Sequence, residues 1–409
     1  MPGFLAAADL HQHYAHADPD RVDALVAELR RRGMPLWDTD SDRVTFVRHV
    51  PGAPEDAGVH VQINRLTDKQ LYSRGLMDRI PGTDLWVLTL HVAPTARISY
   101  GFTEFTGDAP TTSPRPGHHR VATLSDPLNP RPPVGPAGSS GVSVLVGPLA
   151  PAQDEWDQPR EPEGTLLSES GVETPLGPRP AWLYLPDGVD PAEELPVLLI
   201  FDAEVWRDIH PLPQALDRAV ASGRQRPMAI LGVPMIDHAD RMAHLGGHER
   251  FLDAVAGPLC RWAEDLAVSQ GRCLAGPDQR VVAGQSLGGT AALVLLLRHP
   301  ESVGAVISQS PSLWWEPDAA VSPASLGERQ RDWLTSRFDR ISPPSARVLL
   351  SVGTLETASV AHVAELHVLL SSRGVRSEFT AVTGGHDFLW WRGELLRSLA
   401  ELFPPVSGV

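Results

Sequence analysis

The sequence predicts an α/β protein whose mostly parallel sheet is covered by helices and is preceded by a smaller β-sandwich domain. Three observations lead to this expectation. The chain has 409 residues, of which 42% are hydrophobic, enough for two separate cores. Its first part contains short β-rich segments separated by Pro and Gly. After Trp182, uninterrupted apolar segments alternate with helical patterns, which is typical of parallel strands buried on both faces.

The N-terminal part begins with a helical pattern. Residues 20–32 (DRVDALVAELRRR) place apolar side chains at helical spacing, and Gly33 follows as a stop signal. The next apolar segments alternate with polar residues or are β-branched, and turn residues separate them. These predicted strands are 43–50, 59–63, 85–92 and 97–102. Several short strands without helices between them favour a β-sandwich of the immunoglobulin-like type.

A connection rich in Pro, Gly, Ser and Thr covers residues 106–163. This composition predicts a linker or long ordered loops that close the first domain. We therefore assign residues 1–163 to an N-terminal β-sandwich domain with a short helix and this connector, and residues 164–409 to a second domain.

The second domain is expected to have a parallel sheet. Its predicted strands are 196–201, 228–233, 280–283, 305–308, 347–352 and 377–382. Helical patterns lie between them, for example at 248–268, 290–298 and 359–373. Continuous apolar strands that alternate with helical segments predict a parallel sheet covered on both faces.

Composition excludes several classes of protein. The net charge is −15 and no basic tract is present, so nucleic-acid binding is not expected. No apolar run approaches the ~18 residues of a membrane span, and the start lacks a secretory signal, which favours a cytoplasmic protein. Cys260 and Cys273 cannot form a disulfide framework or a zinc site. The cluster His11, His13 and His16 falls on a terminus expected to fray, so no metal or cofactor is predicted.

The candidate nucleophile is Ser286, in the segment Gly284-Gln285-Ser286-Leu287-Gly288. This G-x-S-x-G pattern follows an apolar strand and opens an apolar helix, which is the context of a nucleophile elbow in an α/β-hydrolase. The turn is so sharp that a Cβ beside the serine would collide with its neighbours. The serine then lies at a helix N-terminus, where the N–H of Leu287 can stabilise an oxyanion.

The general base and the orienting acid are expected later in the chain. A predicted strand ends before Thr383-Gly384-Gly385-His386-Asp387, which makes His386 the expected base. Glu356 follows the preceding strand and is the best-placed acid, with Asp387 and Glu316 as alternatives. The second oxyanion donor is expected in the loop 201–206, at a backbone N–H near Glu204.

The sequence resembles the enterochelin (enterobactin) esterase family over nearly its whole length. The matching segments are 79–84 (RIPGTD), 126–130 (DPLNP), 201–204 with Trp206, 283–289 (AGQSLGG), 308–310 with Trp314 and Trp315, and 384–392 (GGHDFLWWR). The resemblance implies a cytoplasmic serine hydrolase that cleaves the trilactone of ferric catecholate siderophores. It also implies a β-sandwich lid on an α/β-hydrolase, with Ser286 and His386 as the catalytic pair. Iron would enter only as part of the substrate. One departure is His244, which stands where the family usually has Glu.

A ferric tris-catecholate is trianionic and flat-faced, so its site needs Arg for charge and aromatic rings for stacking. Three arginines and five tryptophans lie near predicted C-terminal strand ends, where open α/β sheets bind ligands. The arginines are Arg241 and Arg392, expected on loops, and Arg207; the tryptophans are Trp206, Trp314, Trp315, Trp390 and Trp391. The high tryptophan content, 11 against 10 Phe and 4 Tyr, fits such a cleft.

Two other functions fit the same residues. The chain could be a general carboxylesterase or acyltransferase of the esterase-D-like group, which shares the elbow but acts on small esters or lipids. It could also be a non-catalytic protein that binds a siderophore or a carbohydrate on this scaffold. The sequence specifies neither the siderophore nor the oligomeric state.

Overall fold

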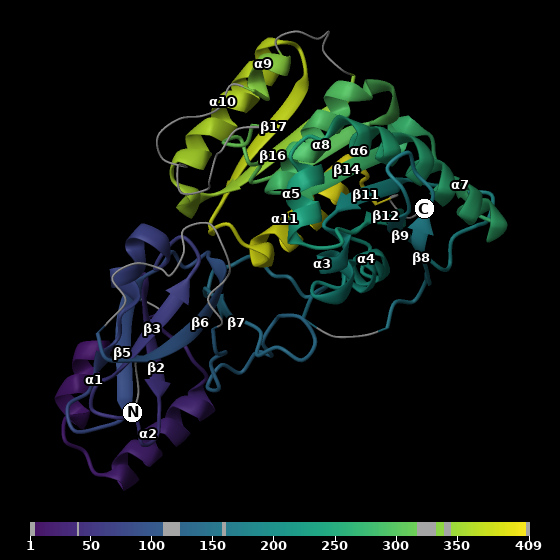
Figure 1. Cartoon of the computed structure of the whole chain (residues 1–409). Coiled ribbons are helices and arrows are strands. Elements are labelled where there is room, and N and C mark those ends of the chain that lie inside the picture. Colours follow the sequence, from purple (N-terminus) through teal and green to yellow (C-terminus); the bar gives the residue numbers. More distant parts are fainter. Residues whose placement is uncertain are drawn as a thin grey trace. The chain divides into compact units, whose positions relative to one another are not determined.

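The computed structural model describes residues 5–38, 41–108, 123–157, 161–316, 333–338 and 345–405 (Figure 1). The chain divides into two compact units. The first comprises Met1–Ala152 together with Thr383–Trp390, and the second comprises Gln153–Val382 together with Trp391–Val409.

The described part of the first unit contains two antiparallel sheets, two α-helices and a short 3₁₀ helix. One sheet has the order β1-β2-β5-β4 and the other β3-β6-β7. The strands are β1 (Leu36–Trp37), β2 (Arg43–His49), β3 (Ala57–Ile63), β4 (Asp78–Arg79), β5 (Leu85–His91), β6 (Arg97–Thr106) and β7 (Ser143–Val146). The helices are α1 (Ala7–Tyr14), α2 (Pro19–Arg32) and the short 3₁₀ helix Lys69–Gly75. The four predicted strands and the predicted helix are therefore confirmed.

Successive side chains of β2 point to opposite faces of its sheet, and this explains how the sheets and helices of this unit are held together. Val47 of β2 packs with Val22, Leu25 and other apolar residues of α1 and α2, which cover one face of the four-stranded sheet. On the opposite face, the ring of Phe46 meets Tyr100 of β6 edge-on, with centroids 5.2 Å apart. This contact joins the two sheets of the unit. Leu10 and Tyr14 of α1 are buried, so the expectation of a frayed terminus is wrong for this helix.

The segment 79–84 is a structural turn of the first unit. The Arg79 guanidinium donates to the carbonyl groups of Thr83 (2.7 Å) and Pro54 (2.8 Å) and lies over the Trp86 ring. The Thr83 hydroxyl donates to the Ile80 carbonyl at 2.8 Å. These contacts satisfy the main-chain groups of a tight turn, which accounts for the motif without a ligand.

The second unit is built on an eight-stranded mixed sheet of order β17-β16-β15-β14-β11-β12-β9-β8. Its strands are β8 (Thr165–Val172), β9 (Arg179–Leu185), β11 (Val197–Phe201), β12 (Ala229–Val233), β14 (Arg280–Gln285), β15 (Ala305–Gln309), β16 (Arg347–Gly353) and β17 (Arg376–Val382). Strand β9 runs antiparallel to both β8 and β12, and the other pairings are parallel. The six predicted strands are confirmed as the parallel part. A parallel pair, β10 (Glu194–Leu195) and β13 (Cys273–Leu274), lies apart from it.

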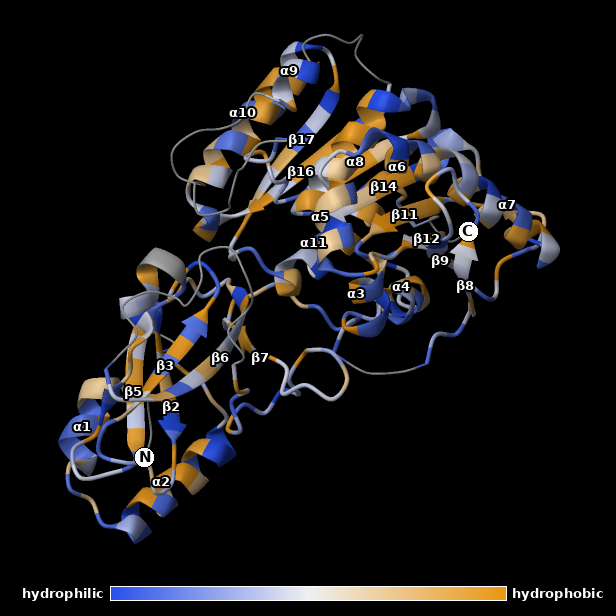
Figure 2. Cartoon of the chain, in the orientation of Figure 1, coloured by the Kyte–Doolittle hydropathy of each residue, from blue (hydrophilic) through white to orange (hydrophobic). Residues whose placement is uncertain are grey.

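Helices cover the sheet on both faces. They are α3 (Ala203–Asp208), α4 (Leu212–Ala221), α5 (His238–Leu245), α6 (Glu249–Ala254), α7 (Cys260–Ser269), α8 (Leu287–Arg298), α9 (Thr335–Phe338), α10 (Ala358–Ser372) and α11 (Phe388–Leu402). In β11, Leu199 belongs to the core shared with α6, α7, α8 and α10, while its neighbours Leu198 and Ile200 face the other way and are also fully buried. Figure 2 shows that β11 and β14, in the middle of the sheet, are apolar strands. The α/β-hydrolase-like arrangement predicted for this unit is therefore confirmed.

The predicted helix 248–268 is interrupted. The structure has α6, then a π-helical turn at Val255–Leu259 that contains Pro258, then α7. Proline has no N–H to donate and its ring clashes with the preceding turn, so the chain widens locally before the helix resumes.

Within the described ranges, no helix is long and apolar enough to cross a bilayer. Among the same residues, no group of three or more His, Cys, Asp or Glu side chains could hold a metal ion.

Candidate active site

Ser286 lies at a sharp turn between β14 and α8 and has a strained backbone. Its φ of 58° and ψ of −122° fall in a region that residues with a Cβ rarely adopt. Its N–H donates to the Gln309 carbonyl at 3.0 Å, and its own carbonyl accepts from Thr290 N and Ser312 N, both at 3.1 Å. These bonds hold the turn in place against its strain.

The glycines around Ser286 are required by close packing. A Cβ on Gly284 would lie 2.1 Å from the Gly288 carbonyl oxygen, and one on Gly289 would lie 2.9 Å from Ser308 Oγ. None of these glycines has a positive φ in the structure. The predicted reason for the motif, lack of space beside the serine, agrees with this geometry.

The Ser286 side chain has one hydroxyl neighbour that sequence reasoning missed. Its Oγ lies 3.2 Å from Ser312 Oγ, and Ser312 is almost fully buried. Either hydroxyl can donate in this pair. Leu287 is the first residue of α8, so its N–H has no acceptor within the helix and is suited to an oxyanion.

A buried chain of amides lies next to the elbow. Gln285 accepts from Trp206 Nε1 at 3.0 Å and donates to Gln309 Oε1 at 2.9 Å. Gln309 in turn donates to the Trp391 carbonyl at 3.0 Å. Both glutamines are fully buried, so these bonds satisfy groups that would be costly to leave unpaired. The indole of Trp206 is thereby fixed to Gln285, the residue before Ser286.

The predicted oxyanion loop is the first turn of a helix. Asp202 has a φ of 52° and precedes α3, whose second residue is Glu204. The Glu204 carboxylate accepts from Met235 N at 2.8 Å. Burial, together with the charge of Asp202, raises the pKa of Glu204. The backbone N–H of Glu204 lies in the first helical turn, where N–H groups lack intrahelical acceptors, so its predicted role as a donor fits the local fold.

Arg241 and Arg392, expected on loops, lie in the helices α5 and α11. Arg241 donates to both oxygens of the Asp202 carboxylate, at 2.7 and 2.8 Å. Burial lowers the pKa of Arg241, but the charge and hydrogen bonds of Asp202 raise it, and the net shift is upward. Arg392 is buried, donates to Gln153 Oε1 at 2.8 Å and lies over the Trp156 ring. The half-buried Arg207 pairs with Asp208.

The predicted tryptophans fall into two groups. Trp206, Trp390 and Trp391 are at most 2% exposed, and the indole N–H of Trp391 donates to Ser310 Oγ at 3.0 Å. Trp314 and Trp315 are partly exposed and meet edge-on at 5.7 Å, with the Trp315 indole bonded to the Gly246 carbonyl. The second group is therefore better placed to meet a ligand.

Glu356 is buried directly after β16. Its Oε1 accepts from Ser310 Oγ at 2.5 Å and from Gly353 N at 2.9 Å. The alternative acid Asp387 is occupied differently: its two oxygens accept from Ser99 and from Leu389 N. Glu316, the other alternative, is partly exposed.

His386 follows β17 in the chain. It lies in the segment Thr383–Trp390, which belongs to the first compact unit. Its backbone N–H donates to Asn64 Oδ1 at 2.7 Å. Ser286 counts with the second unit, so its pairing with His386 stays a prediction. Sequence reasoning also missed Asn64 and Ser99; the buried Gln285, Gln309 and Ser310 stood in family-like segments but had no assigned role.

Comparisons with known proteins agree on one family. A "putative esterase" family model matches residues 175–402, and an "enterochelin esterase, N-terminal" model matches residues 43–156. The chain is 35% identical over 348 residues to the iron(III) salmochelin esterase of Escherichia coli O6:H1, covering 84% of each. It is 30% identical over 396 residues to the iron(III) enterobactin esterase of E. coli K12, covering 91% of this chain and 94% of that one.

Solved structures give the same result for the fold. The enterobactin esterase of Shigella flexneri, in the presence of 2,3-dihydroxy-N-benzoyl-serine, is 27% identical, covers 92% of this chain and 97% of its own, and has a TM-score of 0.74. The ferric enterobactin esterase of Salmonella typhimurium is 27% identical, covers 90% and 96%, and has a TM-score of 0.76. Sequence and structure therefore agree, and the chain belongs to the enterochelin esterase family of ester hydrolases.

Proposed function

We propose that this protein is a serine esterase that hydrolyses the trilactone backbone of ferric catecholate siderophores, such as enterobactin or its relatives, and so helps to release their iron. The observation that carries the proposal is the strained turn at Ser286, between β14 and α8 in a chain of this family. Its relatives are named as iron(III) salmochelin and enterobactin esterases over 84% or more of their length.

In the proposed reaction, the His386 imidazole removes the Ser286 hydroxyl proton as Oγ attacks a lactone carbonyl carbon. Backbone N–H groups of Leu287 and of the first turn of α3, near Glu204, stabilise the oxyanion. The intermediate collapses, the ring ester C–O bond breaks, and the leaving alkoxide takes the proton from His386. Water then attacks the seryl ester, with His386 as base, and returns a free carboxylic acid and the Ser286 hydroxyl.

We assign the orienting acid to Glu356, supported by its burial next to Ser310 after β16. The partly exposed Trp314, Trp315, Arg207 and Arg241 are the residues we propose for contact with the anionic aromatic substrate. Contacts from Arg392, Trp206, Trp390 and Trp391 stay part of the proposal, but their buried packing favours a supporting role.

Several broader predictions complete the proposal. Residues 1–163 are proposed to form a lid domain with an immunoglobulin-like sandwich, and residues 164–409 the catalytic domain. The protein is proposed to act in the cytoplasm, without a cofactor, a bound metal, a nucleic-acid partner or a membrane span; iron is cargo of the substrate.

The test is chromatography of the products formed from ferric and iron-free enterobactin by the purified protein. The parent protein is expected to yield linear trimer, dimer or monomer, and Ser286→Ala to yield none. Full lactone hydrolysis by Ser286→Ala would overturn the assignment of the nucleophile. Faster turnover of short nitrophenyl esters than of the trilactone would favour the general carboxylesterase. Absence of labelling by a fluorophosphonate would favour the binding protein.

The acid is tested separately by Glu356→Gln, which keeps the size of the side chain. We expect kcat to fall by about 10²–10⁴-fold, because an amide cannot stabilise the imidazolium. Glu316→Gln is the matched control and should leave kcat unchanged. If Glu316→Gln lowers kcat and Glu356→Gln does not, the acid is assigned to the wrong residue.

A further inference from the structure

The segment that carries His386 is attached to strands of the first unit. It follows β17, yet Thr383–Trp390 counts with the first unit. Asn64, directly after β3, accepts the His386 backbone N–H on its Oδ1 at 2.7 Å. This single bond joins residues 322 positions apart in the chain.

The residue after His386 is held by β6. The Asp387 Oδ2 atom accepts from both Ser99 N at 2.7 Å and Ser99 Oγ at 2.5 Å. Its Oδ1 accepts from Leu389 N at 2.8 Å, at the start of α11. Asp387 is almost fully buried, so these hydrogen bonds stabilise a carboxylate that would otherwise be costly to bury.

The two glycines before His386 allow this attachment. A Cβ on Gly385 would lie 2.6 Å from both the carbonyl oxygen and Oδ1 of Asn64, and a Cβ on Gly384 would lie 2.4 Å from Trp390 Cδ1. The Trp390 indole donates to the Gly385 carbonyl at 2.6 Å. Neither glycine has a positive φ, so close approach of the backbone, and not a left-handed turn, requires them.

We infer that Asn64 and Ser99 are positioning residues for the catalytic base. The inference rests on the proposed function, in which His386 is that base. Asn64 holds the main chain at His386, and Ser99 holds the next residue, Asp387. The backbone that carries the imidazole is therefore fixed by two neighbouring contacts. A misplacement of about 1 Å in a reacting group can cost 10²-fold in rate. The first unit, which includes the His386 segment, would thus contribute to the chemical step.

The test compares kcat and KM of Asn64 variants on enterobactin at about pH 8, where an ordinary histidine is neutral. Asn64→Ala removes the acceptor of the His386 N–H. We expect kcat to fall by about 10–100-fold with little change in KM, because a base that is no longer held in position slows the chemical step but not substrate binding. Asn64→Asp keeps an oxygen acceptor at the same place and should restore most of kcat. Ser99→Ala keeps its N–H to Asp387 and should have a smaller effect.

The matched control is Asn129→Ala in the same unit. Asn129 donates to the Tyr100 hydroxyl and to the Val144 carbonyl, so its loss weakens the unit without touching the His386 segment. It should lower the melting temperature and leave kcat unchanged. An equal fall of kcat in both alanine variants, or full kcat in Asn64→Ala, would overturn the inference. If Asn64→Ala does not fold, Ser99→Ala is compared with Asn129→Ala in its place.

His386→Ala separates this inference from the proposed function. If His386→Ala keeps the activity of the parent protein, the assignment of the base is wrong. If it abolishes activity while Asn64→Ala and Ser99→Ala do not lower kcat, only the positioning role is wrong.

Discussion

The Ser310 hydroxyl lies 2.5 Å from Glu356 Oε1 and also accepts a hydrogen bond from the Trp391 indole at 3.0 Å. Ser310 has a φ of 46°, a region that costs energy for residues with a Cβ. The cost of this strained backbone is offset because the Ser310 hydroxyl bonds to two buried polar groups at once. This arrangement sets the orientation of the carboxylate that we assign to the catalytic acid.

Replacing this hydroxyl should destabilise the protein and slow the reaction. Ser310→Ala removes the hydroxyl that donates to Glu356 and accepts from the Trp391 indole, so we expect a loss of about 1–3 kcal/mol in the free energy of unfolding. The measurement is the urea midpoint together with kcat. Ser308→Ala on the same strand, which removes only a bond to the Gly289 carbonyl, is the control for stability. A variant Ser310→Ala with the parent's kcat would show that the bridge does not orient the acid.

Ser286→Gly should stabilise the protein while abolishing activity. Glycine accepts a φ of 58° at little cost, whereas serine is held there by surrounding bonds. We expect a gain on the order of 1 kcal/mol in unfolding free energy, seen as a higher melting temperature. Ser286→Ala keeps the Cβ and serves as control, with no gain. Equal melting temperatures for the two variants would mean that the elbow stores little strain.

The first unit should lose stability in mild acid because of His60. Its ring stacks on Tyr72 with centroids 3.8 Å apart, and burial lowers the pKa of His60 to about 4. The unfolded chain has the usual pKa of about 6.5 and binds a proton first, so the stability is fully present above about pH 6.5 and falls toward pH 4. At pH 5 the loss is about 2 kcal/mol.

Hydrogen exchange of the β3 and β6 amides at pH 7 and pH 5 measures this loss. Protection, corrected for the intrinsic rate, should fall more in the parent protein than in His60→Gln. The exposed His238→Gln is the control and should keep the pH dependence of the parent. The same fall in His60→Gln as in the parent would place the responsible proton elsewhere.

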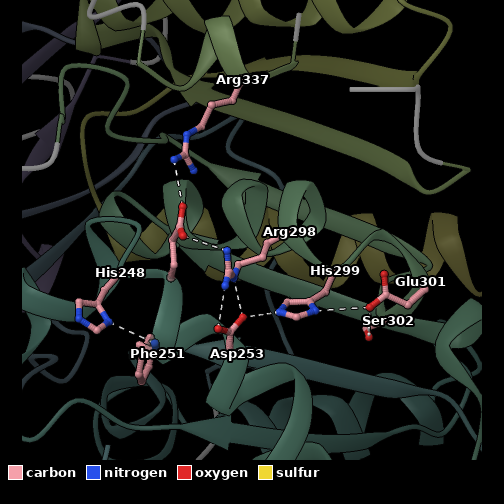
Figure 3. A network of polar contacts seen from close by, with 9 residues as sticks. His248, Phe251, Asp253, Arg298, His299, Glu301, Ser302 and Arg337 are labelled. Atoms are coloured by element: carbon pink, nitrogen blue, oxygen red, sulfur yellow. Dashed lines mark hydrogen bonds and ion pairs between the residues drawn. The ribbon is translucent and has the colours of Figure 1, made fainter. Parts of the chain in front are cut away.

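A surface network on the second unit should weaken at low pH and at high salt (Figure 3). Asp253 accepts from Arg298 and from His299 Nε2, and Arg298 also pairs with Glu249. The hydrogen bond from Arg298 lowers the pKa of Asp253 to about 2. Partial burial acts in the opposite direction, and the hydrogen bond and charge of His299 lower this pKa further. Because the folded pKa is depressed, the contribution to stability is present above about pH 4 and is lost as pH falls toward 2.

Asp253→Asn should therefore melt slightly below the parent at pH 7, with a difference that shrinks between about pH 4 and pH 2 and in 1 M salt. The side chains are about one-third exposed, so the effect is small. Asp265→Asn, at an exposed position in α7, is the control. A difference that is constant with pH and salt would argue against an ionic contribution.

The sequence alone determined the main elements because their signals are local. The apolar run 196–201 and its five counterparts are parallel strands, and residues 20–32 form α2 with Gly33 at its end. The elbow around Ser286 also follows from local sterics, since the glycine spacing and the strand-to-helix context are both in the sequence. The antiparallel strands β8 and β9 were not predicted; for β8 the reason is that it is a largely exposed edge strand with a mixed pattern.

Tertiary structure decided what the polar residues do. It placed Arg241 on Asp202, Trp206 on Gln285, and Asn64 and Ser99 on the segment of His386. Each of these contacts consists of one or two hydrogen bonds between residues far apart in the chain, and such a contact leaves no periodicity in the sequence. Strands and turns obey rules that act over a few residues. The partners of a buried polar group are set only when the chain has folded around it, because the low-dielectric interior penalises every group left unpaired.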